Sequence, residues 1–197
     1  MVYFIIIFAV MALDITAAIF ASYATGVFSL WYATIAPLFT LLYIFLSMGI
    51  AAIFMRVAPQ KWWKHNNAFF CEKPWEKNFY NKVGIKKWKE KIPDWSASNG
   101  FPKGEMQGRE IAYLERFIYE TCYGEMLHFI SIFIPFSALA LFEISFWWYI
   151  IPILITNVLL QIPTIFIQRY NRIRLLSLYN RKLKQQAMQE AKTETQV

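Results

Sequence analysis

Long hydrophobic runs, interrupted by one extended basic and polar stretch, dominate the pattern along this 197-residue chain. A hydrocarbon core about 30 Å thick is crossed by roughly 20 helical residues at 1.5 Å per residue, and each run reaches about that length. The expected membrane spans cover about residues 2–22, 31–55, 117–141 and 146–167. The pattern predicts an all-α integral membrane protein with four transmembrane helices, folded as a single membrane domain over residues 1–197.

Basic residues are segregated in a way that predicts the orientation of these spans. Lysine and arginine are absent from residues 1–55 and 117–168 and are concentrated in residues 56–116 and 169–197. A basic side chain costs about 2.5–3.5 kcal/mol at the centre of a membrane, and basic loops stay on the cytoplasmic side. We therefore expect a multi-pass protein of the cell membrane, with a cytoplasmic loop over 56–116, a cytoplasmic tail over 168–197 and both termini in the cytoplasm.

The basic loop is expected to contain a helix that lies in the head-group plane of the membrane. Apolar side chains recur there at helical spacing, at Trp75, Phe79, Val83 and Trp88, and lysines occupy the other face. The net charge of +7 is then explained by positive-inside topology and by attraction to anionic head groups. Membrane lipids, and no nucleic acid, are the expected partners.

The third span contains ionisable residues, although hydrophobic residues would cost less free energy in a membrane. Glu120, Glu125 and His128 share one broad helical face, because His128 lies roughly 80° from Glu120 and roughly 60° from Glu125 at about 100° per residue. A carboxylate three positions away can bond one ring nitrogen and leave the other to accept a proton. Intramembrane ionisable residues usually serve function, so this face predicts a general base in a polar cleft.

Other interpretations of the same residues stay open. The polar groups can instead satisfy one another and fix helix packing. A carboxylate di-metal site would need a second Glu-x-x-His motif, which His65 does not supply, so no metal and no other cofactor is expected. Cys122 lies roughly 120° from His128 on the helical wheel, and a nucleophilic role for it is less favoured than a packing role.

A basic cluster follows the fourth span. Arg169, Arg172 and Arg174 lie within six residues of one another, interleaved with Tyr170 and Asn171. Arginines at this level anchor a span at the membrane surface, and their planar forks also suit a phosphate or a carboxylate. The cluster is therefore a candidate ligand-binding site as well as an anchor.

Three segments, in this order between these spans, carry a resemblance to a known family. They are WEKNFYNKVGIKKWKEKIPD (75–94), FIYETCYGEMLHF (117–129) and QIPTIFIQRYNRIRL (161–175). Over roughly residues 62–176 the chain resembles the glycosyl-4,4'-diaponeurosporenoate acyltransferase family, small bacterial membrane enzymes associated with the last step of staphyloxanthin synthesis. The first two spans match that family only in hydrophobic character.

The resemblance implies a membrane-embedded O-acyltransferase of carotenoid biosynthesis. It would transfer a fatty acyl group to a hydroxyl of a lipid-linked acceptor, a glycosylated carotenoid or another glycolipid. His128 would deprotonate that hydroxyl, with Glu125 or Glu120 orienting the ring. The implied substrate-binding residues are Arg169, Asn171, Arg172, Arg174, Trp75 and Asp94.

Several features of such an enzyme stay open at the level of sequence. The acyl donor can be acyl-CoA, an acyl carrier protein or a phospholipid, and the acceptor and the oligomeric state are not specified. A part for Cys122 or Asp94 in catalysis also stays open. The alternative function is a non-enzymatic membrane assembly or helix-packing partner, which would use the same polar residues as contacts between helices.

Overall fold

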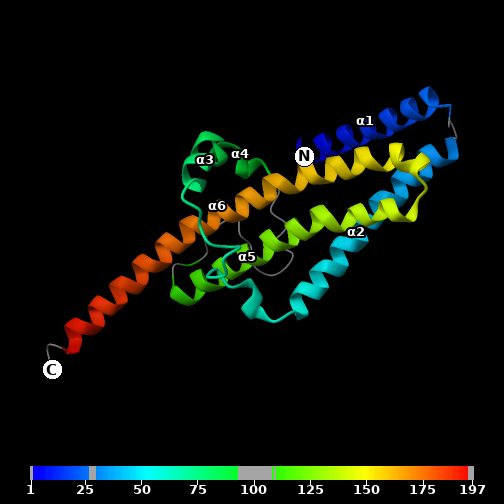
Figure 1. Ribbon diagram of the computed structural model, residues 1–197. Helices are drawn as coiled ribbons and strands as arrows, with labels where there is room; N and C mark the ends of the chain where they lie inside the picture. Colours follow the sequence, from blue (N-terminus) through cyan, green and yellow to red (C-terminus); the bar gives the residue numbers. More distant parts are fainter. Residues whose placement is uncertain (1, 27–29, 93–107, 109, 195–197) are drawn as a thin grey trace. The chain divides into compact units, whose positions relative to one another are not determined.

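The structure is a computed structural model that describes residues 2–26, 30–92, 108 and 110–194, and all regular structure in these residues is helical (Figure 1). The long helices are α1 (Val2–Ala24), α2 (Leu30–Val57), α5 (Ile111–Phe133) and α6 (Trp147–Glu194). The short helices are η1 (Gln60–Trp63), α3 (Glu76–Lys82), α4 (Ile85–Trp88), η2 (Lys89–Lys91), η4 (Ile134–Leu141) and η5 (Ile144–Phe146). The prediction of an all-α protein is confirmed.

Three helical stretches of the described residues are long and apolar enough to cross a membrane. They are Thr34–Val57, Ile111–Leu141 and Ile144–Thr193, and a shorter apolar stretch covers Phe8–Ala24. Three to four helices therefore meet the requirement that the hydrophobic pattern set for spans.

Two of the expected spans lie in helices whose course differs from one simple α-helix of the same length. The third changes to a 3₁₀ helix after Phe133, where Pro135 has no N–H to continue the α-helical hydrogen bonds. The helix that contains the fourth, α6, passes through Pro152 and Pro163 and continues beyond Ile167 to Glu194. The basic tail is thus the continuation of this helix.

The expected head-group helix is two short helices. Gly84 lies between α3 and α4 with φ of +64°, a left-handed conformation that glycine adopts at little cost and that ends a right-handed helix. Trp75 and Val83 are exposed, whereas Phe79 and Trp88 pack around the buried Tyr80 and Ile85. The prediction of one continuous amphipathic helix over these residues is wrong.

The chain divides into two compact units. The apolar unit consists of Met1–Ala58 and Met126–Ile165. One of its cores joins Ala18, Ala36 and Tyr149, and another joins Ile44 to Ile150, Ile153 and Leu154. Many of its large hydrophobic side chains lie outside these cores and are exposed, among them Phe8, Phe45 and Ile50.

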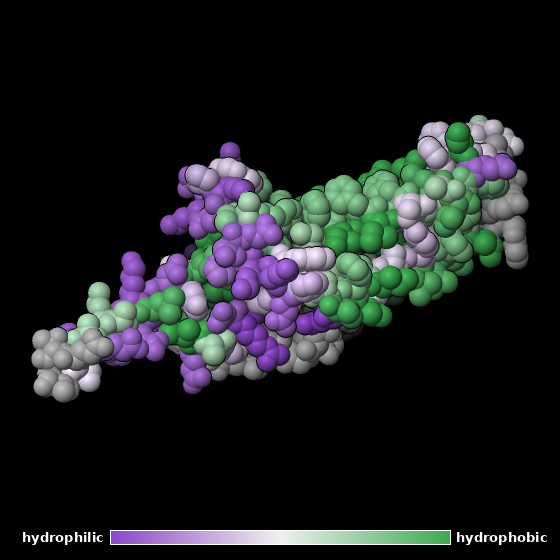
Figure 2. Space-filling view, turned by 60° about the horizontal axis from the view of Figure 1, so that its bottom comes forward, coloured by the Kyte–Doolittle hydropathy of each residue, from purple (hydrophilic) through white to green (hydrophobic). Residues whose placement is uncertain are grey.

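The basic unit consists of Pro59–Glu125 and Phe166–Val197, and it holds every lysine and arginine of the chain except Arg56. In one of its cores Leu114, Phe117 and Ile118 of α5 pack on Leu175 of α6, and in another α3 and α4 pack on Tyr170 of α6. Figure 2 shows the contrast on one face, where hydrophobic side chains gather over the apolar unit and hydrophilic ones over the basic unit.

Candidate active site

His128 of the apolar unit is half-buried and is held by a chain of hydrogen bonds that ends on the backbone. Its Nδ1 lies 2.7 Å from Oε1 of Gln161, and Nε2 of Gln161 donates to Oδ1 of Asn157 at 3.1 Å. Asn157 Nδ2 donates to the carbonyl of Ser131 at 2.8 Å. Gln161 and Asn157 are buried, so these bonds join α5 and α6 away from solvent.

The direction of this chain fixes the tautomer of the imidazole. The carbonyl of Ser131 can only accept, so the amide of Asn157 must face it with the nitrogen and face Gln161 with the oxygen. Gln161 then donates with its nitrogen and presents its oxygen to Nδ1. Neutral His128 therefore carries hydrogen on Nδ1 and a lone pair on Nε2, which is the form of the ring that accepts a proton from a hydroxyl.

The sequence explains why the carbonyl of Ser131 can accept the last hydrogen bond of this series. A helical carbonyl normally bonds the N–H four residues later, and for Ser131 that residue is Pro135, which has none. Asn157 supplies the donor in its place. The proline that ends α5 thereby creates the fixed point from which His128 is oriented.

The basic unit holds a buried cluster of four charged side chains. Arg169 and Arg172 lie three residues apart on α6, Glu125 lies on α5 and Glu76 on α3. Arg169 donates to Glu125 Oε1 and to Glu76 Oε1, each at 2.7 Å, and Arg172 donates to Glu125 Oε2. Glu76, Glu125 and Arg172 are at most 2% exposed.

Backbone and aromatic groups complete the surroundings of the two arginines. Arg169 also donates to the carbonyls of Phe69 and Cys71, each at 3.2 Å. The guanidinium of Arg172 lies 5.3 Å from the ring centre of Phe70, within the range of a cation–π contact. The segment before α3 is thereby fastened to α6.

Two negative and two positive charges balance in this cluster, which is the condition for burying charge at tolerable cost. Both oxygens of Glu125 already accept arginine hydrogen bonds, so its geometry is that of an ion-pair partner. Three buried atoms of this cluster have no partner among the described residues, namely Nε of Arg169, Nη1 of Arg172 and Oε2 of Glu76. These atoms are available to a water or a ligand.

A tyrosine next to this cluster is held in its protonated form. Burial, reinforced by the negative charge of Glu76, raises the pKa of Tyr80 to about 12. Its ring packs edge-on against Tyr170 with 6.0 Å between the ring centres. At neutral pH Tyr80 is therefore a neutral phenol whose ring serves packing.

The structure places the other predicted site residues in several environments. Glu120 is buried on α5, Asn171 is half-buried on α6, Arg174 is exposed and Trp75 is 60% exposed. Asp94 lies outside the described residues. Cys122, considered as a nucleophile, is completely buried. Among the described residues no three His, Cys, Asp or Glu side chains come together as a metal site.

The structure brings together residues that the sequence did not connect. Arg169 and Arg172 were predicted to grip a ligand and Glu125 to orient His128, whereas these arginines bond Glu125 and the Nδ1 position of His128 is bonded by Gln161. Glu76, Asn157 and Gln161 were given no role. Asn157 and Gln161 share a helical face at a spacing of four and are polar residues in an apolar run, a signal that points to partners on a facing helix.

Comparison with known proteins gives one family. The model of the family described as Glycosyl-4,4'-diaponeurosporenoate acyltransferase matches residues 59–181, which include His128, the residues that orient it and the buried charge cluster. A protein of that name from Staphylococcus aureus (strain MRSA252) is 29% identical over 155 residues, which are 69% of this chain and 82% of the relative. No solved structure matches the chain significantly.

Proposed function

This chain belongs to the glycosyl-4,4'-diaponeurosporenoate acyltransferase family and is an acyltransferase, and we propose that it is embedded in a membrane and acylates a sugar hydroxyl of a lipid-linked acceptor. The acceptor is a glycosylated carotenoid, as the name of the family implies, or another glycolipid. The donor is an activated fatty acyl group. Membership in a family of enzymes favours this function over a non-enzymatic role in helix packing.

The surface of the apolar unit supports a membrane location. Phe8, Phe45 and Ile50 are each more than 60% exposed on α1 and α2, although burial of such side chains is worth about 1.5–3 kcal/mol each in water. Hydrocarbon removes that cost, and it is the solvent in which a lipid-linked acceptor and an acyl chain already lie. Both termini and the basic unit would face the cytoplasm.

The observation that carries the proposed chemistry is the oriented imidazole of His128. Acylation of a hydroxyl needs a base that takes the hydroxyl proton as the oxygen attacks the acyl carbonyl. The bonds through Gln161 and Asn157 to the Ser131 carbonyl set Nε2 as the basic nitrogen, and they hold the ring in an apolar unit where a free histidine would be costly.

The proposed reaction proceeds in two steps. Nε2 of His128 accepts the proton while the sugar oxygen forms a bond to the acyl carbon, which gives a tetrahedral intermediate. The bond between that carbon and the leaving sulfur or oxygen of the donor then breaks, and the proton passes from the imidazolium to the leaving group. The products are the acyl ester of the acceptor and the deacylated donor.

Glu125, Arg169 and Arg172 are proposed to hold the elements of the basic unit in position for substrate binding. The ion pairs of these arginines with Glu76 and Glu125 tie α3 and α5 to α6, and a clamp of this kind fixes the helix face from which ligands are bound. The unpartnered Nη1 of Arg172 and Nε of Arg169 are also suitable donors to a substrate oxygen.

Lipid mass spectrometry on cells that make the acceptor tests the proposal. Cells with the wild-type chain are expected to contain the acceptor heavier by one acyl group, and cells with His128→Ala are expected to lack it. In purified enzyme the same change should lower kcat by about 10²–10⁴-fold, the usual contribution of a positioned base.

His65→Ala is the matched control, because it makes the same change at a histidine of the basic unit. It should leave product and kcat at wild-type levels. Wild-type turnover in the His128→Ala variant would show that His128 is not the base. The absence of any acylated lipid in wild-type cells would show that the proposed class of acceptor is wrong.

A further inference from the structure

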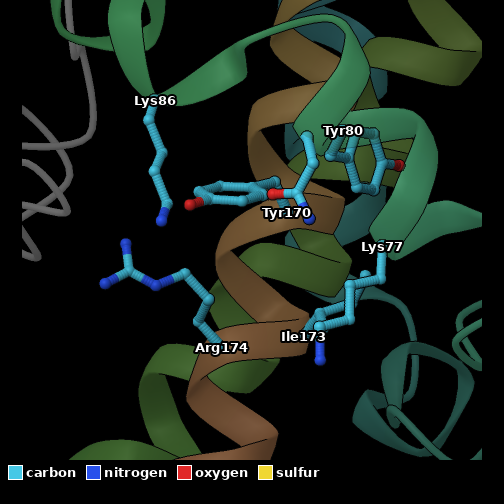
Figure 3. Close-up of a pocket in the computed structure, with 7 residues that line it drawn as sticks. Lys77, Tyr80, Lys86, Tyr170, Ile173 and Arg174 are labelled. Carbon is cyan, nitrogen blue, oxygen red and sulfur yellow. The ribbon is translucent and has the colours of Figure 1, made fainter.

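A pocket of about 150 Å³ lies in the basic unit between α3, α4 and α6. It is lined by Lys77, Tyr80, Asn81, Lys86, Tyr170, Ile173 and Arg174 (Figure 3). Cavities of about this volume hold a molecule the size of benzene. The pocket therefore has room for a compact group such as a phosphate and none for an acyl chain.

The cations that line the pocket are not ion-paired within the part of the chain that the structure describes. Lys77, Lys86 and Arg174 form no ion pair with any of the described residues, whereas Arg169 and Arg172 nearby on α6 are paired with carboxylates. Placing three positive charges at one small pocket without a counterion costs repulsion that a bound anion would remove.

A fourth cation adds to this repulsion. Lys89 and Arg174 both lie near the ring of Tyr170, at 5.8 Å and 5.6 Å from its centre. Burial lowers the pKa of Lys89, and the charge of Arg174 lowers it further, against a smaller opposing effect of Glu90. The charge of Arg174 therefore disfavours the charged form of Lys89, and a bound anion would oppose this effect.

Tyr170 supplies an independent indication of a ligand. The residue is 6% exposed, and its hydroxyl is buried with no hydrogen-bond partner among the described residues. Figure 3 shows this hydroxyl directed between the ends of Lys86 and Arg174. A buried hydroxyl without a partner is destabilising, and a ligand oxygen between these cations would remove that cost.

We propose that this pocket binds a phosphate group of the acyl donor. Lys86 and Arg174 pair with the phosphate oxygens, the Tyr170 hydroxyl donates to one of them, and Lys77 adds positive charge. The inference rests on the proposed acyl transfer and places the anion site away from Arg169 and Arg172, whose charges are balanced by Glu76 and Glu125. Coenzyme A thioesters, phosphopantetheine and phospholipids all carry such a phosphate.

Direct binding tests the pocket without turnover. The purified full-length protein in detergent is titrated in a calorimeter with coenzyme A, and separately with a short-chain phosphatidylglycerol. Lys86→Gln and Arg174→Gln are expected to weaken binding of the effective probe by roughly tenfold each, since a charge-assisted bond to phosphate is lost. Tyr170→Phe should weaken it several-fold. Which probe binds tells a soluble donor from a lipid donor, and either result supports the pocket.

Lys87→Gln is the matched control, because Lys87 is an exposed neighbour on α4 that does not line the pocket. Equal weakening by Lys87→Gln, or no binding of either probe, would overturn the inference. Acyl transfer by the same proteins separates the two proposals. If Lys86→Gln and Arg174→Gln turn over with a wild-type KM for the donor, the pocket does not bind the donor and the proposed acyl transfer still stands. If binding depends on Lys86 but no acyl transfer is measured, the pocket binds phosphate and the proposed function is wrong.

Discussion

Gln161 decides which nitrogen of His128 can act as a base. Its oxygen accepts from Nδ1, and its nitrogen is committed to Asn157, so the amide cannot turn without setting two oxygens against each other. An imidazole held in this way keeps its Nε2 lone pair directed away from Gln161. The action of His128 as a base therefore depends on the amide of Gln161 as well as on the imidazole itself.

Gln161→Met tests this role, because methionine has similar volume and cannot bond Nδ1. We expect kcat to fall by about 10- to 100-fold, the usual effect of losing the partner that orients a functional histidine, with KM nearly unchanged. Steady-state kinetics on the purified enzyme measures both values. Gln168→Met, the same change seven residues later on α6, serves as the control. A Gln161→Met enzyme with lower affinity and unchanged kcat would assign Gln161 to substrate binding.

Glu125 belongs to the balance of buried charge, and a change there should appear in stability. In Glu125→Gln the guanidiniums of Arg169 and Arg172 stay buried with only Glu76 to oppose them. Breaking a buried pair in this way should lower the free energy of unfolding by about 3–5 kcal/mol. Thermal unfolding in detergent measures the loss.

Glu115→Gln is the comparison, since Glu115 lies on the exposed face of α5 and its replacement should change stability by about 0.5 kcal/mol or less. If Glu125→Gln unfolds at the same temperature as Glu115→Gln and yet loses turnover, the carboxylate acts in the reaction and the stabilising role is refuted.

At the scale of elements, the turn between α3 and α4 sets the distance between the cations of the pocket. Lys77 lies on α3 and Lys86 on α4, and the left-handed Gly84 between them lets the chain change direction from one helix to the next. A single continuous helix would place these lysines along one axis. The break therefore forms the wall of the pocket.

Gly84→Ala is expected to raise the KM for the acyl donor several-fold and to cost about 1–2 kcal/mol of stability, because a side chain in the left-handed region is strained. Space is not the cause, since the atom nearest to an added Cβ is Cδ of Lys87 at 3.9 Å. Donor titrations measure the effect. Gly49→Ala, within α2 and with nothing within 4 Å of the added Cβ, should leave the KM for the donor unchanged. An unchanged KM in Gly84→Ala would show that donor binding does not depend on this turn.

At the scale of the whole molecule, charge divides between the two units. The basic unit contains all basic residues except Arg56, and that residue lies at the end of α2. Positive-inside insertion then predicts that residues 59–116 and the end of α6 face the cytoplasm.

Single cysteines test this topology in a chain from which Cys71 and Cys122 have been removed. Lys82→Cys and Glu190→Cys should react with a membrane-impermeant maleimide only from the cytoplasmic side, and Thr25→Cys only from outside. Mass spectrometry of intact and opened cells measures the labelling. Reaction of Lys82→Cys from outside would reverse the orientation, because most of the basic residues would then lie on the wrong side.

The sequence by itself determined the helical class, the apolar stretches and the separation of charge. These features follow from hydrophobicity along the chain, which acts locally and needs no partner. The sequence also identified His128, Glu125 and Arg169 as functional candidates, because polar groups in apolar helices require an explanation.

Only the tertiary structure decided which of these groups bond to one another. The three-residue spacing of Glu125 and His128 favours a local pair, but the bond that fixes the His128 ring comes from Gln161, 33 residues away, and Arg169 bonds Glu76 across 93 residues. Spacing along a helix specifies neighbours on that helix alone. Partners on other helices depend on packing, and so does the pocket, whose walls form only where Gly84 turns the chain and α6 continues beyond its apolar stretch.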